Sequence, residues 1–170
     1  MIERAQIAKD IERSAEHLIE TITNFPEDKF NRKPAPGEWS AGEVAEHLII
    51  IGRGQSRILA KPAQPTTGRN PLGKLDEMRR RMSDFTDKVV AMDPVLPMGN
   101  PITKADAIQQ IKDNTKSILD GVVTEDLTMM TPITNRLFGE LTRAEWIYFA
   151  IYHCERHIKQ MEKIKEALQR

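Results

Sequence analysis

Three of the four histidines in this sequence occupy positions where helical proteins usually place apolar side chains. His153 and His157 are four residues apart in the apolar stripe of a C-terminal helix, and His47 lies on the core-facing side of an earlier helix. Imidazoles avoid an apolar core unless a partner satisfies them. Side chains at i and i+4 lie about 5–6 Å apart on a helix, so two imidazoles there can reach one ion. The pattern therefore indicates a divalent-metal site made by two helices, with open coordination positions left for chemistry.

The alternative interpretation is that each histidine simply hydrogen-bonds a neighbour in the core. That interpretation would be preferred for one lone histidine, but three on the core faces of two helices favour the metal. His17 lies off the apolar stripe of its own helix, so a solvated side chain is expected rather than a fourth ligand. Zinc, nickel and iron all accept nitrogen ligands, and we expect zinc or nickel.

Two reactive residues beside these histidines have simpler explanations. Glu43 lies one turn before His47 and could act as a general base, but a capping role at the helix start explains it and is preferred. Cys154 follows His153 and points about 100° away around the helix, so a small packed side chain is expected rather than a ligand.

Two further motifs lie outside the proposed site. The run 79–81 consists of three arginines and could bind an anion, but the acidic residues around it favour a solvated charged face. Met129 and Met130 either line a pocket or fill the core, and the sequence does not decide between these roles.

Composition limits the classes of partner. The chain has 170 residues, enough for one domain over 1–170, and its 25 basic and 25 acidic residues balance, which argues against nucleic acid or a membrane surface. The single cysteine fits a reducing cytosol. Residues 1–30 carry scattered charges, so we expect no signal peptide, and no apolar run approaches the roughly 20 residues that span a bilayer. A cytoplasmic protein is expected.

Helical periodicity runs through the whole sequence and predicts the elements that hold the histidines. Helices are expected near 1–24, from Ser40, near 73–92, from Thr103, and from Thr142 to about 168. Ser40 and Thr142 are each followed three residues later by glutamate, the pattern of a capping box. Proline-rich segments separate the helices, and 124–140 is expected to be irregular, with no strand anywhere. The fold class is therefore all-α, a four-helix bundle with an additional helix in its connections.

Two segments resemble the DinB/YfiT-like superfamily. These are PGEWSAGEVAEHL at 36–48 and LTRAEWIYFAIYHCERHIKQM at 141–161, with Arg156 and Gln160 at familiar places and FGEL at 138–141 also fitting. The resemblance implies a four-helix bundle with an unusual helix order and a divalent metal held by His47, His153 and His157. Characterised relatives are mostly thiol-dependent: S-transferases that use bacillithiol, mycothiol or glutathione, and an isomerase.

Three functions follow from such a site. A metal-bound thiol would transfer to a small-molecule electrophile, whereas metal-bound hydroxide would hydrolyse a small ester or amide. A non-catalytic metal-binding stress protein is the third. The resemblance favours the transferase, with a low-molecular-weight thiol as co-substrate. A homodimer is also expected, because the superfamily commonly dimerises and the third predicted helix presents a methionine-rich face.

Overall fold

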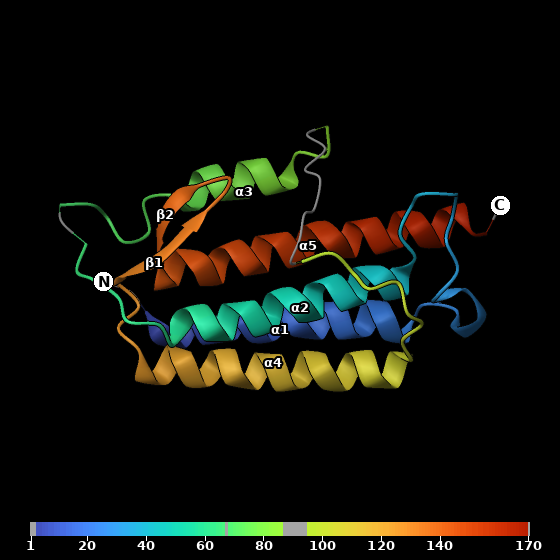
Figure 1. The fold of residues 1–170 in the computed structure, drawn as a ribbon, viewed down its shortest axis with the longest axis horizontal. Coiled ribbons are helices and arrows are strands. Elements are labelled where there is room, and N and C mark those ends of the chain that lie inside the picture. The colour runs from blue at the N-terminus through green and yellow to red at the C-terminus, as the bar shows by residue number, and fades with distance from the viewer. Residues whose placement is uncertain (1–2, 67, 87–94, 170) are drawn as a thin grey trace.

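Four long helices pack side by side into a bundle (Figure 1). The computed structural model describes residues 3–66, 68–86 and 95–169. The bundle consists of α1 (Arg4–Thr23), α2 (Ala41–Leu59), α4 (Lys104–Thr124) and α5 (Arg143–Ala167). Helices α1 and α2 each contact both α4 and α5, so α1 lies diagonally opposite α2. The predicted four-helix bundle with an additional helix is confirmed.

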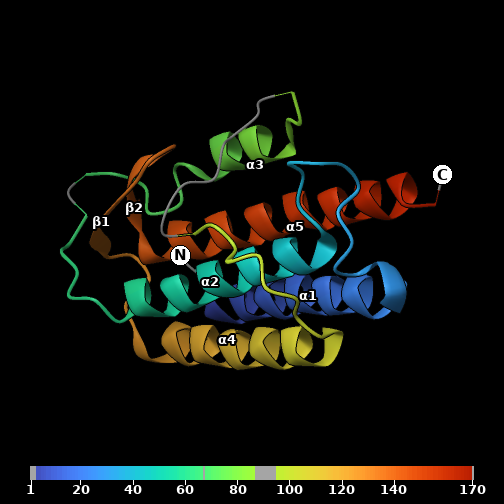
Figure 2. The ribbon, with the colours of Figure 1, turned by 45° about the vertical axis from the view of Figure 1, so that its right-hand side comes forward.

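The helix directions explain the long connections. Helices α1 and α5 run one way along the bundle and α2 and α4 run the other way (Figures 1 and 2). Because the neighbours α2 and α4 are parallel, the chain between them must return along the whole bundle. Segment 60–103 makes this return and contributes the short helix α3 (Leu75–Ser83), which packs on α5. Within the described residues, no helix combines the length and apolar character needed to cross a membrane.

Both helices that carry the three histidines begin with a reciprocal cap. At the start of α2, Ser40 Oγ accepts from the amide of Glu43 (3.1 Å), and Glu43 Oε2 accepts from the amide of Ser40 (2.8 Å). Thr142 and Glu145 make the same pair at the start of α5, at 3.1 and 3.0 Å. The predicted capping boxes are confirmed, and they set where each helix begins.

Helix α3 is shorter than the helix predicted over 73–92, because it ends at Ser83. The Asp84 carboxylate accepts from the amide and the hydroxyl of Thr86, at 2.9 and 2.6 Å. This local turn competes with helical hydrogen bonding and ends the helix. The predicted residues 87–92 lie outside the described residues. The methionine-rich face is buried inside the chain, against Phe138, Leu141 and Trp146, so it gives no support for a dimer.

Arg79 and Arg80 are exposed, as a solvated charged face predicts, and Arg81 is half-buried. The Arg79 guanidinium lies 5.6 Å from the centre of the Tyr152 ring. Arg81 lies over the Phe138 ring at 5.4 Å and donates to the backbone oxygen of Leu137 at 3.1 Å. These contacts fasten α3 to α5 and to the turn after β1.

The expectation of an irregular, strand-free segment over 124–140 is wrong. Strands β1 (Met130–Asn135) and β2 (Gly139–Thr142) form an antiparallel hairpin beside α3. Both buried side chains of β1, Thr131 and Asn135, are polar, and the pairing register shifts between Met130 and Thr134. The strand therefore lacks the apolar alternation that sequence analysis looks for. Thr131 is satisfied, because its Oγ1 accepts from Trp146 Nε1 at 2.8 Å.

The cap at the start of α5 also holds the return segment. Glu145 is fully buried, and its carboxylate accepts two hydrogen bonds from the Arg69 guanidinium, at 2.6 and 2.7 Å. It also accepts from the backbone amide of Lys74 at 3.1 Å. One buried carboxylate thus joins the helix start to residues more than 70 positions earlier, and these donors satisfy its oxygens.

Replacing Arg69 with methionine should destabilise the fold, because it leaves a buried carboxylate with fewer donors. We expect a loss of about 2 kcal/mol in unfolding free energy, seen as a fall of about 4–8 °C in melting temperature. Arg13→Met is the matched control, since Arg13 pairs with Asp10 at 2.7 Å on the surface, and it should not change the melting temperature measurably. Equal melting curves for the two variants would contradict this account of Glu145.

Candidate metal centre

The structure brings together the three histidines singled out in the sequence. His47 comes from the second turn of α2, and His153 and His157 come from the middle of α5. One ring nitrogen from each lies within 4.8 Å of the other two. The Nε2 atoms of His153 and His157 are 3.1 Å apart, and the ring centres of His47 lie 5.2 Å and 4.7 Å from theirs.

Hydrogen bonds to the outer nitrogens set the protonation of two of these rings. His47 Nδ1 lies 2.6 Å from the backbone oxygen of Val95, which can only accept, so Nδ1 carries the proton and Nε2 has the lone pair. His157 Nδ1 lies 2.7 Å from Gln160 Oε1, with the same consequence. A histidine that ligates a metal usually donates its other N–H to such an oxygen.

His153 has a different environment. Its Nδ1 is buried and has no hydrogen-bond partner among the described residues. Its Nε2 faces the Nε2 of His157, which bears a lone pair. Without a cation, His153 must therefore carry its proton on Nε2 and donate it to His157 Nε2. A cation at this point would accept both lone pairs instead. Two nitrogens that share one ion at about 2.0–2.1 Å each lie roughly 3 Å apart, which the observed separation fits.

Aromatic side chains form the walls around the three rings. The Trp39 ring centre lies 5.1 Å from that of His47 and 6.5 Å from that of His157, nearly parallel to the latter. Phe149 stacks on His153 at 5.5 Å. These rings keep bulk water from the imidazoles on two sides, which strengthens any electrostatic interaction within the site.

The environment keeps all three histidines uncharged. Burial lowers the pKa of His47, and the hydrogen bond to Val95 opposes this only in part. Burial, followed by the other two histidines, holds the pKa of His153 well below its usual range. Burial and His47 lower the pKa of His157 to about 3. Neutral imidazoles are the form that binds metal, so at physiological pH the cluster is ready to act as a donor set.

Arg156 lies three residues after His153 and directly before His157, but it points toward α3. Its Nη1 donates to the backbone oxygens of Met82 (3.2 Å) and Asp84 (2.5 Å), and its guanidinium lies 4.9 Å from the centre of the Phe85 ring. Its positive charge adds to the lowering of the pKa values of His153 and His157. Arg156 therefore secures the end of α3 and disfavours protonation of the cluster.

The remaining candidate residues lie where the sequence predicted. His17 is exposed and its Nδ1 lies 3.1 Å from a carboxylate oxygen of Glu155. Burial alone would raise the pKa of Glu43, but an ion pair with Lys33 at 2.8 Å and the cap with Ser40 outweigh it. Cys154 packs into the bundle interior rather than toward the histidines.

Sequence analysis missed the groups that support the three rings. Trp39 and Gln160 were noted only as parts of the resemblance, and Phe149 and Val95 were not noted at all. A glutamine three residues after a histidine on one helix face is a usable signal for Gln160. No sequence signal marks Val95, because a backbone oxygen contributes the contact.

Acid should destabilise the metal-free protein through these histidines. The unfolded chain takes up histidine protons near pH 6.5, whereas His157 in the folded chain does so only near 3. The unfolded state therefore binds more protons between these values, and stability falls as the pH falls. From pH 7.5 to 5 we expect a loss of about 2 kcal/mol for each histidine that stays neutral, measured by denaturant unfolding.

A double variant tests whether these histidines, rather than other titrating groups, cause the acid sensitivity. A double replacement of His153 and His157 with leucine should flatten the dependence of stability on pH, whereas His17→Ala should keep the wild-type slope. If the double variant retained the wild-type slope, the acid sensitivity would have to come from other groups.

Comparisons with known proteins identify the family and the fold. A sequence profile of the DinB superfamily matches residues 10–161. The chain is 26% identical over 153 residues to the uncharacterized protein YuaE of Bacillus subtilis (strain 168), covering 88% of this chain and 91% of that protein. It also resembles the crystal structure of TT2238, a four-helix bundle protein, with a TM-score of 0.59 and 17% identity over 95% of this chain and 99% of that one. Since the superfamily profile spans both histidine-bearing helices, the chain belongs to the DinB superfamily.

Proposed function

We propose that His47, His153 and His157 hold one divalent metal ion, zinc or nickel. The observation that carries this proposal is the convergence of three uncharged imidazoles, two of which have their outer nitrogens committed as donors. The 3.1 Å separation of His153 Nε2 and His157 Nε2 adds to it, since one ion can accept a lone pair from each nitrogen. Core histidines without a ligand would more simply be replaced by aliphatic side chains.

We further propose that the site transfers a low-molecular-weight thiol to a small electrophile. Membership of the DinB superfamily supports the choice of a thiol. When bound, a divalent cation with three neutral ligands lowers the pKa of a coordinated thiol, so that thiolate is available at neutral pH. The thiol proton passes to solvent, the sulfur forms a bond to the electrophilic carbon, and the leaving group departs with its electron pair.

The chain's own residues would orient the thiol and exclude water. Val95 and Gln160 fix the orientation of two imidazoles, and the rings of Trp39 and Phe149 restrict access to the cluster. Exclusion of water favours thiol transfer over hydrolysis, because water competes for the same position and electrophile. Glu43 is committed to its cap and to Lys33, so we assign it no role as a base.

Loss of any of the three histidines should abolish stoichiometric metal binding. Protein purified without a metal-affinity tag should contain one divalent ion per chain by elemental analysis, and His47→Ala, His153→Ala and His157→Ala should each lose it. Gln160→Leu should weaken metal affinity by about 10–100-fold, since it removes only the partner of one ligand. His17→Ala is the matched control and should keep its metal. Full occupancy after loss of both α5 histidines would refute the site.

Metal-loaded protein should consume thiol only when an electrophile is present. The assay follows free thiol from glutathione, bacillithiol or mycothiol with a chloronitrobenzene as electrophile, and p-nitrophenyl acetate without thiol tests for hydrolysis. Activity should disappear on chelation and in His153→Ala, and should persist in Cys154→Ala, because burial raises the pKa of that thiol to about 12. Ester cleavage without thiol would indicate the hydrolase, and bound metal with neither activity a non-catalytic protein.

A homodimer and a cytoplasmic location stay predictions. The methionine-rich face offered for dimer formation is buried within the chain, with Met78 and Met82 at most 4% exposed. Among the described residues, the large apolar side chains that remain exposed are Leu96, Met98 and Val123.

A further inference from the structure

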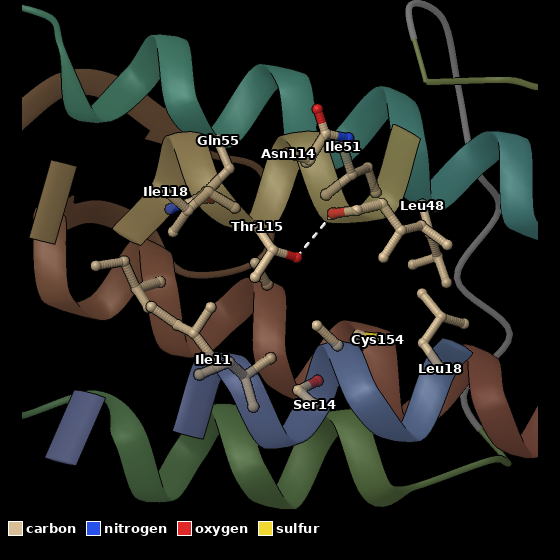
Figure 3. Close-up of a pocket in the computed structure, with 16 residues that line it drawn as sticks. Ile11, Ser14, Leu18, Leu48, Ile51, Gln55, Asn114, Thr115, Ile118 and Cys154 are labelled. Carbon is tan, nitrogen blue, oxygen red and sulfur yellow. Dashed lines mark hydrogen bonds between the residues drawn. The ribbon is translucent and has the colours of Figure 1, made fainter. Parts of the chain in front are cut away.

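A cavity that is partly open to solvent interrupts the apolar core of the bundle. It measures about 90 Å³, and side chains from α1, α2, α4 and α5 point into it (Figure 3). Its walls take residues from both apolar clusters of the bundle: Leu18, Leu48 and Ile111 from one, and Ile11 and Ile147 from the other. The cavity therefore lies where these two clusters would otherwise meet.

The cavity is separate from the histidine cluster. Its described walls include none of the three histidines and no charged side chain. Most of the lining is aliphatic, but Ser14, Gln55, Asn114, Thr115 and Cys154 also contribute. An apolar cavity of this kind normally stays dry, so the polar members of the lining decide what it can hold.

Two polar members of the lining have no partner. Ser14 Oγ and Gln55 Nε2 are buried without a hydrogen bond among the described residues, and their side chains come from helices on opposite corners of the bundle. Their neighbours show that the fold can satisfy such groups. Thr115 Oγ1 donates to the backbone oxygen of Ile111 at 2.7 Å, and Asn114 Nδ2 donates to that of Ile49 at 3.0 Å.

Unsatisfied polar groups are rare inside proteins and usually indicate a missing partner. The Ser14 hydroxyl contacts the Cys154 thiol, and this contact partly opposes the rise that burial causes in the thiol pKa. Sulfur is a weak donor and acceptor, so this contact does not replace a normal hydrogen bond for Ser14. Cys154 remains a protonated, unreactive thiol at neutral pH. The cavity is thus suited to binding a molecule and not to covalent chemistry through this cysteine.

We propose that this cavity is a second ligand site, which binds a small uncharged molecule with a short aliphatic body and a hydroxyl or carbonyl group. The aliphatic walls take the body, and Ser14 Oγ and Gln55 Nε2 supply the hydrogen bonds for the polar group. An ionised ligand would lose its hydration with no opposite charge in the described walls. A cavity of roughly 150 Å³ accommodates benzene, so this smaller one limits the ligand to a few non-hydrogen atoms. The proposal does not depend on whether the histidines bind metal.

The test uses 1-butanol as the probe and butyrate as its charged counterpart. Titration of the full-length protein, observed through its isoleucine methyl groups by NMR, should give saturable shifts for Ile11, Ile118 and Ile151 with butanol and none with butyrate at neutral pH. A ligand of this size should bind with a dissociation constant in roughly the millimolar range or tighter.

Variants of Ser14 test whether butanol binding depends on the space in the cavity and on the hydroxyl of Ser14. Ser14→Leu fills the cavity and should abolish the butanol shifts while raising the melting temperature. Ser14→Ala keeps the space and removes one polar partner, so it should weaken butanol binding roughly two- to tenfold. Ser117→Leu, on the exposed face of α4, is the matched control and should bind as the wild type does. The proposal is overturned if butanol causes no saturable shift, if Ser14→Leu still binds it, or if a crystal soaked in butanol holds only water in the cavity.

Discussion

The main physical constraint on this structure lies in the contact between α2 and α5. At the centre of that contact, three imidazoles occupy positions where apolar side chains would normally pack. Burying a polar ring without a partner is unfavourable, and burying a charged one is more so. The structure meets this constraint by keeping the rings neutral and by giving His47 and His157 an acceptor each, from Val95 and Gln160. His153 is the exception, because its Nδ1 is buried without a hydrogen bond among the described residues.

The two capping boxes are what place these rings opposite one another. A one-residue shift in the start of a helix turns every side chain by about 100°, so His47 faces α5 only if α2 begins at the right residue. The buried carboxylates of Glu43 and Glu145 mark these starts, and each pairs with a cation from outside its helix: Lys33 in the loop before α2 and Arg69 in the return segment. The geometry of the site thus depends on electrostatic contacts at the starts of both helices.

Features that depend on one helix could be predicted from the sequence. The helix starts at Ser40 and Thr142 and the histidine stripe on α5 are local patterns, and they were right because capping and periodicity act within one or two turns. Features that depend on partners elsewhere in the chain could not be predicted. The hairpin buries polar Thr131 because Trp146 satisfies it, and α3 ends early because Asp84 forms its own turn. For the same reason, Ile147 and Ile158 are both buried although they lie off the face of α5 that carries His153 and His157.

Helix α5 lies between two places where the apolar core is interrupted. The histidines lie on one face of the helix, and the cavity lies on another. His153 and Cys154 are adjacent in sequence, and they point to these two different environments. The two apolar clusters of the bundle both contribute side chains to the walls of the cavity. Natural sequences give up local packing mainly where another interaction compensates or where function requires it. Ser14 Oγ and Gln55 Nε2 would each gain a partner from a ligand in the cavity, whereas a metal would bind His153 through Nε2 and not through its buried Nδ1. The simplest physical account is that the centre of the bundle is built to be completed by molecules other than the chain itself.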